Sequence, residues 1–148
     1  MQAIAISLTA LDVEWRRLEI ISENLANANV ANSGKGVNFQ ELHLISGPKN
    51  DFASFLDPKK ADGAGIDIDK LAGIQALGVQ ASSAPPRMVH EPGNPQANKA
   101  GFVAYPAIDQ ASQMTQMIQT SRAYEADIVA IGAAREMYAK ALQLGEHS

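Results

Sequence analysis

The most constraining feature of this sequence is where its helix-breaking residues fall. All seven prolines and nine of the eleven glycines lie between residues 34 and 106. Proline disrupts the interior of a helix, and glycine weakens it. The chain of 148 residues therefore divides into a proline-free start (residues 1–33), a Gly/Pro-punctuated middle (34–106) and a proline-free end (107–148). Its total length is that of one ordinary domain.

The start has the pattern of an amphipathic helix. Its apolar residues recur every three or four positions, as in the seam of a coiled coil. They are Ile4, Leu8, Leu11, Trp15, Leu18 and Leu25. A second apolar set falls on nearly the opposite side (Ile6, Val13 and Ile20), and apolar residues on two faces imply at least two packing partners. The asparagine-rich run from Asn27 to Gly34 predicts the helix end, because Asn and Gly tolerate the left-handed backbone of a C-terminal cap.

The end of the chain has the same pattern. Asp109 is the expected N-cap and Gly145 the expected stop. The seam between them comprises Met117, Tyr124, Ile128, Ile131, Tyr138 and Leu142. Helices of about 25–33 residues would each be roughly 40–50 Å long. Two such helices can pair and still leave apolar faces over, and exposed faces of that kind mark interaction surfaces.

The middle predicts a small β-rich insertion. Short, partly alternating segments bounded by Gly and Pro turns are typical of strands. These segments are Val37–Ile45, Ile66–Lys70, Ile74–Gln80, Arg87–Glu91 and Phe102–Tyr105. Residues 46–65 are polar and predict a mobile loop. The expected fold class is therefore α+β, with the terminal helices paired as an antiparallel coiled coil.

Composition and charge narrow the function classes. A chain that is 46% hydrophobic and 19% charged can bury a core and does not have the composition of a disordered protein. The net charge is −4 and the basic residues are scattered, so we expect no nucleic-acid partner. No apolar run approaches the roughly 18 residues of a membrane span, and the acidic first thirty residues do not resemble a cleaved signal, so we expect no membrane insertion. There are no cysteines, which excludes disulfides and thiolate chemistry.

The chemical motifs in the sequence are weak. His90-Glu91 begins like a zinc-protease motif, but Pro92 and Gly93 forbid the required helix and the second histidine is missing. Asp67 and Asp69 do not have the order of an EF-hand loop, and solvated charges on a strand explain them. We therefore expect no enzymatic activity, no metal site and no cofactor.

Two motifs at opposite ends of the chain resemble a known family. The segment Ile20–Asn29 (IISENLANAN) resembles the N-terminal signature of bacterial flagellar rod and hook proteins, and Gln113–Ala126, ending in RAYEA, resembles the C-terminal one. The runs Pro85–Pro95 (PPRMVHEPGNP) and Gly101–Pro106 (GFVAYP) are similar to those of proximal rod proteins. Val30 and the run Phe39-Gln40-Glu41 depart from the family pattern.

The resemblance implies a structural subunit of the flagellar basal-body rod, which crosses the periplasm and transmits torque. It implies export by the flagellar type III apparatus and packing of the terminal helices with copies of the chain and other rod subunits in a helical tube. The expected assembly residues are Leu8, Leu11, Leu18, Asn24, Leu25, Asn27, Arg122, Tyr124, Glu125, Ile128, Ile131 and Leu142. We expect Asn24 and Asn27 to bond at the helix end, and Arg122 and Glu125 to make contacts between subunits.

Two alternatives use the same residues differently. A soluble helical-hairpin adaptor, or a binding module of an export system, would form a small closed oligomer or a one-to-one complex in place of a tube. An enzyme that processes murein or depends on a metal would lose activity when His90, Glu91 or the Asp67/Asp69 pair is changed. Only the rod subunit accounts for both terminal signatures.

Overall fold

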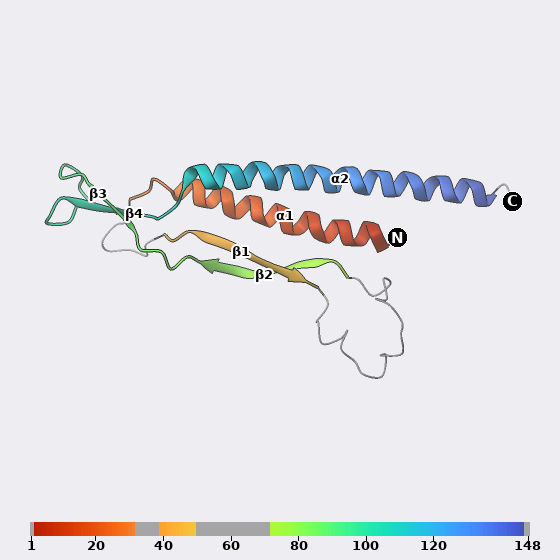
Figure 1. Ribbon diagram of the computed structural model, residues 1–148, viewed down its shortest axis with the longest axis horizontal. Coiled ribbons are helices and arrows are strands. Elements are labelled where there is room, and N and C mark those ends of the chain that lie inside the picture. The colour runs from red at the N-terminus through yellow and green to blue at the C-terminus, as the bar shows by residue number, and fades with distance from the viewer. Residues whose placement is uncertain (1, 32–38, 50–71, 147–148) are drawn as a thin grey trace, which may run out of the picture. The chain divides into compact units, whose positions relative to one another are not determined.

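The computed structural model describes residues 2–31, 39–49 and 72–146 of the chain. It contains two helices, α1 (Gln2–Asn27) and α2 (Gln110–Glu146), and four strands, β1 (Leu42–Pro48), β2 (Ile74–Ala81), β3 (Arg87–His90) and β4 (Phe102–Tyr105) (Figure 1). Strand β1 pairs with β2 and β3 with β4, in two small antiparallel sheets. The predicted α+β class is confirmed.

Helix α1 ends at Asn27, where the asparagine-rich run begins. The expected left-handed cap is wrong for the described asparagines, because no described residue other than glycine has a positive φ. The turn is closed by hydrogen bonds: the Val30 N–H donates to the Asn27 carbonyl (3.0 Å) and Asn27 Nδ2 donates to the Glu23 carbonyl (2.8 Å). Asn27 thus bonds at the helix end, as predicted.

Helix α2 begins where the sequence indicates. Asp109 Oδ1 accepts from the Ala111 N–H (3.1 Å), and the Asp109 carbonyl accepts from the Gln113 N–H (3.0 Å), which confirms the predicted N-cap. The predicted stop at Gly145 is wrong, since the helix runs on to Glu146. A glycine ends a helix by taking a positive φ, and in the described chain only Gly73 and Gly101 do so. The 37-residue helix is about 55 Å long at 1.5 Å per residue.

The predicted strands agree best with the observed ones in the C-terminal part of the middle segment. Strands β2, β3 and β4 lie within one residue of their predicted bounds, whereas β1 begins later than predicted and runs to Pro48, into the predicted loop 46–65. The β1–β2 ladder continues past both strand ends, because the Ser82 N–H donates to the Glu41 carbonyl (2.7 Å) and the Lys49 N–H to the Gly73 carbonyl (2.9 Å). Residues 50–71, which include the predicted strand Ile66–Lys70, lie outside the described residues.

The chain forms two compact units, and the first comprises Met1–Trp15, Ser46–Leu77 and Arg122–Ser148. In this unit the start of β2 lies against α1. Gly73 has a φ of +87°, and a Cβ added there would overlap the hydroxyl oxygen of Thr9. That hydroxyl accepts from the Ile74 N–H (3.1 Å) and donates to the Ile6 carbonyl (2.7 Å). The close approach requires glycine at position 73.

The second unit comprises Arg16–Ile45 and Gly78–Ser121, and it includes the β3–β4 hairpin. In the hairpin Arg87 pairs with Tyr105 and His90 with Phe102. The loop between them is fixed by Asn98, whose Oδ1 accepts from the N–H groups of Ala100 (2.9 Å) and Phe102 (3.0 Å). The hairpin is therefore held by local hydrogen bonds rather than by a large core.

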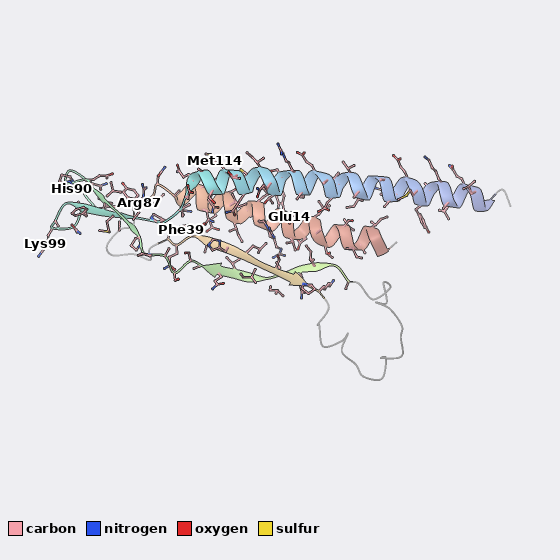
Figure 2. All side chains as sticks on the ribbon, in the orientation of Figure 1. Glu14, Phe39, Arg87, His90, Lys99 and Met114 are labelled. Atoms are coloured by element: carbon pink, nitrogen blue, oxygen red, sulfur yellow. The ribbon has the colours of Figure 1, made fainter. Side chains whose placement is uncertain are left out.

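Few hydrophobic side chains are buried in the described chain. The buried ones are Val13, Ile21, Ala28 and Val103. Three buried polar residues join them: Asn24, Gln113 and Thr120. By contrast, seventeen large hydrophobic side chains are exposed, many of them along α2, where Met114 is 56% exposed (Figure 2). Exposed apolar surface of this extent favours association with other molecules, because association removes it from water.

Candidate functional site

The twelve predicted assembly residues differ widely in exposure. Asn24 is buried. Six are half-buried: Leu11, Leu18, Leu25, Asn27, Tyr124 and Ile131. Five are exposed: Leu8, Arg122, Glu125, Ile128 and Leu142. Ile128 is 49% exposed and Leu142 55%, so a neighbouring molecule can reach both residues.

The least exposed stripe of α2 is more polar than the apolar seam predicted from the sequence. Its members alternate at spacings of four and three, as the a and d positions of a heptad do. They are Gln113, Met117, Thr120, Tyr124, Asp127, Ile131 and Ala134, each buried or half-buried. Hydrophobicity alone missed Gln113, Thr120 and Asp127 because they are polar. Their seven-residue spacing, in register with Met117, Tyr124 and Ile131, was the signal that could have revealed them.

A contact between aromatic rings joins the two helices in the first unit. The rings of Trp15 on α1 and Tyr124 on α2 lie 6.3 Å apart between centroids, tilted by 47°. This is a favourable separation for an aromatic pair. Both residues belong to the seams that the sequence predicted, and Tyr124 is in the C-terminal signature.

In the second unit a set of hydrogen bonds, here called the polar junction, joins Asn24, Glu41, Leu42 and Gln113. Asn24 Nδ2 donates to the Leu42 carbonyl (2.8 Å) and to Gln113 Oε1 (3.2 Å), while Asn24 Oδ1 accepts from the Leu42 N–H (2.9 Å). Gln113 Nε2 donates to Glu41 Oε1 (2.7 Å). Asn24 and Gln113 are each 1% exposed, so the hydrogen bond between them is buried, where its loss is costly.

The polar junction corrects the expected role of Asn24. This residue does not bond at the helix end; it connects α1 with the start of β1 and with α2. The reason is its position, three residues before the end of α1, on the buried side of the helix with Ile21 and Ala28. Asn27 directly precedes Ala28 and therefore lies on a different side of the helix from that stripe. It makes the hydrogen bond at the helix end.

The β3–β4 hairpin has its own polar cluster around Glu91. Glu91 Oε2 accepts from the Tyr105 hydroxyl (3.0 Å) and from Asn94 Nδ2 (2.9 Å). The hydrogen bond to Glu91, followed by desolvation and the negative charge of Glu91, raises the pKa of Tyr105 above its usual value, and the Arg87 charge opposes this shift. The Arg87 guanidinium lies 5.7 Å from the centre of the Tyr105 ring.

His90 packs against an aromatic ring. Its imidazole centroid lies 5.0 Å from that of Phe102, and Glu91 bonds to Tyr105 and Asn94. Among the described residues no three His, Cys, Asp or Glu side chains gather as metal ligands. Asp67 and Asp69 lie outside the described residues.

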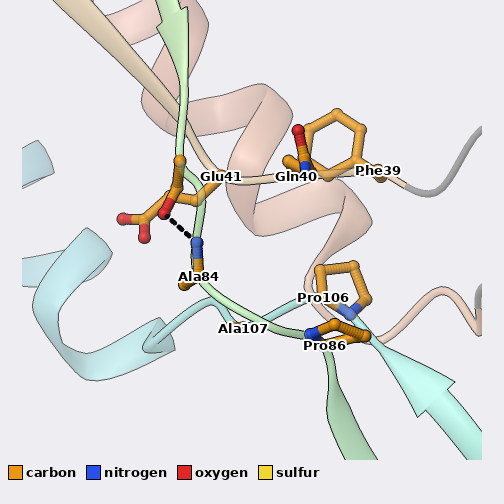
Figure 3. Close-up of a pocket in the computed structure, with 8 residues that line it drawn as sticks. Phe39, Gln40, Glu41, Ala84, Pro86, Pro106 and Ala107 are labelled. Atoms are coloured by element: carbon orange, nitrogen blue, oxygen red, sulfur yellow. Dashed lines mark hydrogen bonds between the residues drawn. The ribbon is translucent and has the colours of Figure 1, made fainter.

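Two cavities lined by described residues are small. One of about 50 Å³ is lined by Phe39, Gln40, Glu41, Ser82, Ala84, Pro86, Pro106 and Ala107 (Figure 3). Another of about 130 Å³ lies beside the polar junction, lined by Arg17, Ile20, Ile21, Leu42, His43, Leu44, Gln113 and Gln116. Typical small-molecule sites measure about 300–1,000 Å³, so neither of these two cavities has the size of such a site, and the exposed surfaces of the described residues are the features considered below. Neither helix, over its described residues, has the length and apolar character needed to span a membrane.

Comparisons with protein families and with known proteins identify flagellar rod proteins as relatives of this chain. The family model described as the C-terminal region of flagellar basal body rod FlgEFG proteins matches residues 99–144. The flagellar basal-body rod protein FlgC of Salmonella typhimurium is 30% identical over 138 residues, which cover 93% of this chain and 92% of the relative. FlgC of Bacillus subtilis is 25% identical over 148 residues, covering 97% of each chain. FlgC of Borreliella burgdorferi is 25% identical over 146 residues, covering 96% of this chain and 95% of the relative.

These similarities define the class of protein: a structural component of the rod in the bacterial flagellar basal body. Within that class, the chain belongs to the FlgC family of basal-body rod proteins. The resemblance predicted from the terminal signatures and the PPR…GFVAYP region is confirmed. The comparisons lend no support to the adaptor alternative.

Proposed function

We propose that the chain is a non-enzymatic building block of a helical tube, the proximal rod, which crosses the periplasm and transmits torque. The terminal segments 1–33 and 107–148 form the wall of the tube, and the β-rich segment 34–106 lies further out. Its partners are copies of the chain and other rod subunits. The flagellar type III apparatus exports it.

The observation that carries this proposal is the exposed apolar surface of α2. Ile118, Val129 and Met137 are 56%, 70% and 67% exposed, and with Leu142 and Leu144 they are distributed around the helix. A helix that is apolar on several sides is stable when it is surrounded by other elements. The described part of the chain holds only one other long helix, so neighbouring subunits must supply the rest of the cover. Subunits in a lattice that does not close use different faces for different neighbours.

Two contacts support antiparallel pairing of α1 and α2 within a subunit. Trp15 meets Tyr124 in the first unit, and Asn24 meets Gln113 in the second. Going from the first contact to the second, the residue number rises on α1 and falls on α2. That is the order expected of an antiparallel coiled coil, and the four–three spacing of the α2 stripe is the spacing such a pair requires.

The proposal is tested by isolating flagellar basal bodies and quantifying this chain by mass spectrometry. We expect enrichment at a few copies per basal body relative to the other rod subunits. Absence of the chain from well-formed basal bodies would overturn the assignment to the rod.

The assembly surface is tested by placing a charge on it. Ile128→Asp puts a carboxylate on a side chain that is 49% exposed, so folding of the free subunit should be little affected while packing against a neighbour is lost. Gln119→Asp, at an exposed polar position of the same helix, is the matched control. We expect Ile128→Asp to abolish motility and incorporation into the basal body, and Gln119→Asp to preserve both. Normal motility of the Ile128→Asp strain would show that this face of α2 is not an interface.

A further inference from the structure

The apolar pattern of the two terminal helices does not by itself fix how far one helix slides along the other. On α1 the seam repeats every seven residues through Leu11, Leu18 and Leu25, and on α2 it repeats through Met117, Tyr124 and Ile131. Sliding α2 by seven residues brings each apolar side chain to the place of its equivalent in the next heptad. Two helices with such repeats can pair in more than one register unless something interrupts the repeat.

The polar junction interrupts it. Seven residues beyond Gln113 on α2 lies Thr120, and seven residues before it lies Pro106, which precedes the helix. The one alternative register of this kind therefore places Thr120 opposite Asn24. In that register Tyr124 is replaced by Ile131 beside Trp15.

We infer that the polar junction selects the register of α1 on α2, with Gln113 as the positioning residue. This inference rests on the helix pairing proposed above. Gln113 joins two residues through two different atoms: its Oε1 accepts from Asn24 Nδ2 and its Nε2 donates to Glu41 Oε1. Thr120 has one hydroxyl on a much shorter side chain and reaches at most one of them. A seven-residue slip therefore leaves either the buried Asn24 Nδ2 or the part-buried Glu41 Oε1 without its partner on α2, and that loss disfavours the slipped register.

The junction also explains why α2 is the part that would slip. Asn24 is tied to the backbone of Leu42 by two hydrogen bonds, one donated and one accepted. Helix α1 and the start of β1 therefore stay together whatever α2 does. Among the hydrogen bonds described above, those of Gln113 run from this pair to α2. Glu41, which receives one of them, belongs to the Phe39-Gln40-Glu41 run that departs from the family pattern, so the complete junction does not follow from the family resemblance.

The test uses the absence of cysteine from the sequence. Two cysteines introduced into the full-length chain can be joined by a short bis-maleimide without competing thiols. The pair Trp15→Cys with Tyr124→Cys reports the register of the structure. The pair Trp15→Cys with Ile131→Cys reports the register shifted by seven residues, with both α2 reporters at the same heptad position.

Each reporter pair is combined with Gln113→Ala, and with Gln119→Ala as a control at an exposed position of the same helix. In Gln113→Ala the observed register no longer offers Asn24 a side-chain acceptor on α2, whereas the shifted register offers the Thr120 hydroxyl. We expect the ratio of shifted to observed cross-links to rise at least tenfold in Gln113→Ala and to stay unchanged in Gln119→Ala. Combining Gln113→Glu with Glu41→Gln exchanges donor and acceptor and should restore the original ratio.

The possible outcomes distinguish a failure of the register inference from a failure of the proposed helix pairing. An unchanged ratio in a folded Gln113→Ala chain overturns the role of the junction in register and leaves the helix pairing intact. Loss of helical circular dichroism in Gln113→Ala, with the control folded, also overturns it, because the contact would then support folding and not selection. No cross-link at either reporter pair with the junction intact overturns the proposed pairing itself.

Discussion

Asn24 and Asn27 show that two asparagines of one sequence motif can have different structural roles. The signature Asn-Leu-Ala-Asn contains two asparagines that look equivalent in the sequence, yet Asn24 is 1% exposed, while Asn27 is half-buried and its side chain donates to the Glu23 carbonyl of its own helix. An amide carries both donor and acceptor groups, so Asn24 can satisfy the N–H and the carbonyl of Leu42 together. A carboxylate or a leucine at this position cannot do both.

The pKa of Tyr105 provides a prediction at the scale of single residues. Its rise comes first from the hydrogen bond to Glu91. We therefore expect Glu91→Ala to lower the Tyr105 pKa toward the ordinary tyrosine value of about 10, and Arg87→Ala to raise it further, because the Arg87 charge favours the phenolate. Ultraviolet titration of the phenolate measures both, in a background where Tyr124 and Tyr138, the other two tyrosines, are changed to Phe.

The sign of the accompanying pH dependence follows from the direction of the shift. Because the pKa of Tyr105 is higher in the folded chain than in the unfolded one, its hydrogen bond contributes fully to stability below the ordinary tyrosine pKa. The contribution is lost as the pH rises through the raised value. A Tyr105 pKa that does not respond to Glu91→Ala would contradict the hydrogen bond as the main cause.

The N-cap of α2 gives a second residue-scale prediction. Asp109→Ala removes the acceptor of the Ala111 N–H and should lower the free energy of unfolding by about 1 kcal/mol, within the usual range of about 0.5–2 kcal/mol. Asp109→Asn keeps an oxygen acceptor and is the control. Urea unfolding followed by circular dichroism measures both variants. Equal losses for the two would mean that the negative charge, and not the hydrogen bond, stabilises the helix start.

At the scale of elements, Gly73 links β2 to α1. Its φ of +87° and the overlap of an added Cβ with the Thr9 side chain predict that Gly73→Ala is destabilising by more than about 1 kcal/mol. Gly78, in β2 itself, has no atom within 4 Å of an added Cβ, so Gly78→Ala should change stability by no more than about 0.5 kcal/mol. Urea midpoints of the two variants test this. Similar midpoints would show that the Thr9–Ile74 contact does not depend on the glycine.

The sequence predicted elements where a local pattern determines them. The proline-free ends, Asp109 and the alternating runs of β2, β3 and β4 carry their own signals, and the structure places these elements close to the predicted bounds. The extent of β1 depends on a distant partner: β1 reaches Pro48 because β2 offers hydrogen bonds there. The hydrogen-bond partners in the polar junction lie up to 89 positions apart, and the sequence does not indicate which of them pair. The seven-residue spacing marks Gln113 as a member of the least exposed stripe of α2, but it does not identify Asn24 and Glu41 as its partners.

At the scale of the whole molecule, the contrast between the small buried core and the wide apolar surface matches the family assignment. Four hydrophobic residues are buried in the described chain, and seventeen large ones are exposed. In a protein that functions as a monomer such a surface is unfavourable, because exposed apolar patches promote association. Under the proposed function the same surface is the source of assembly energy, and the inferred role of the polar junction is to specify the geometry in which the surface is presented.

The C-terminal part of α2 allows assembly to be separated from folding. Residues 135–145 are all exposed, and Met137, Leu142 and Leu144 are 67%, 55% and 74% exposed. Replacing these three by Gln keeps a good helix former at each position while removing apolar surface. We expect the triple variant to retain the helical circular dichroism and the urea midpoint of the original chain, yet to be absent from isolated basal bodies.

Two comparisons make the result decisive. A chain that ends after residue 136 removes both the apolar surface and the length of the helix, so it should fail to incorporate in the same way as the triple Gln variant. A matched variant with Gln at Ala133, Arg135 and Lys140, which are exposed on the same helix and carry little or no large apolar surface, should incorporate normally. If the triple variant at Met137, Leu142 and Leu144 incorporated while the truncated chain did not, helix length would be the requirement, and the apolar surface of this segment would have no part in assembly.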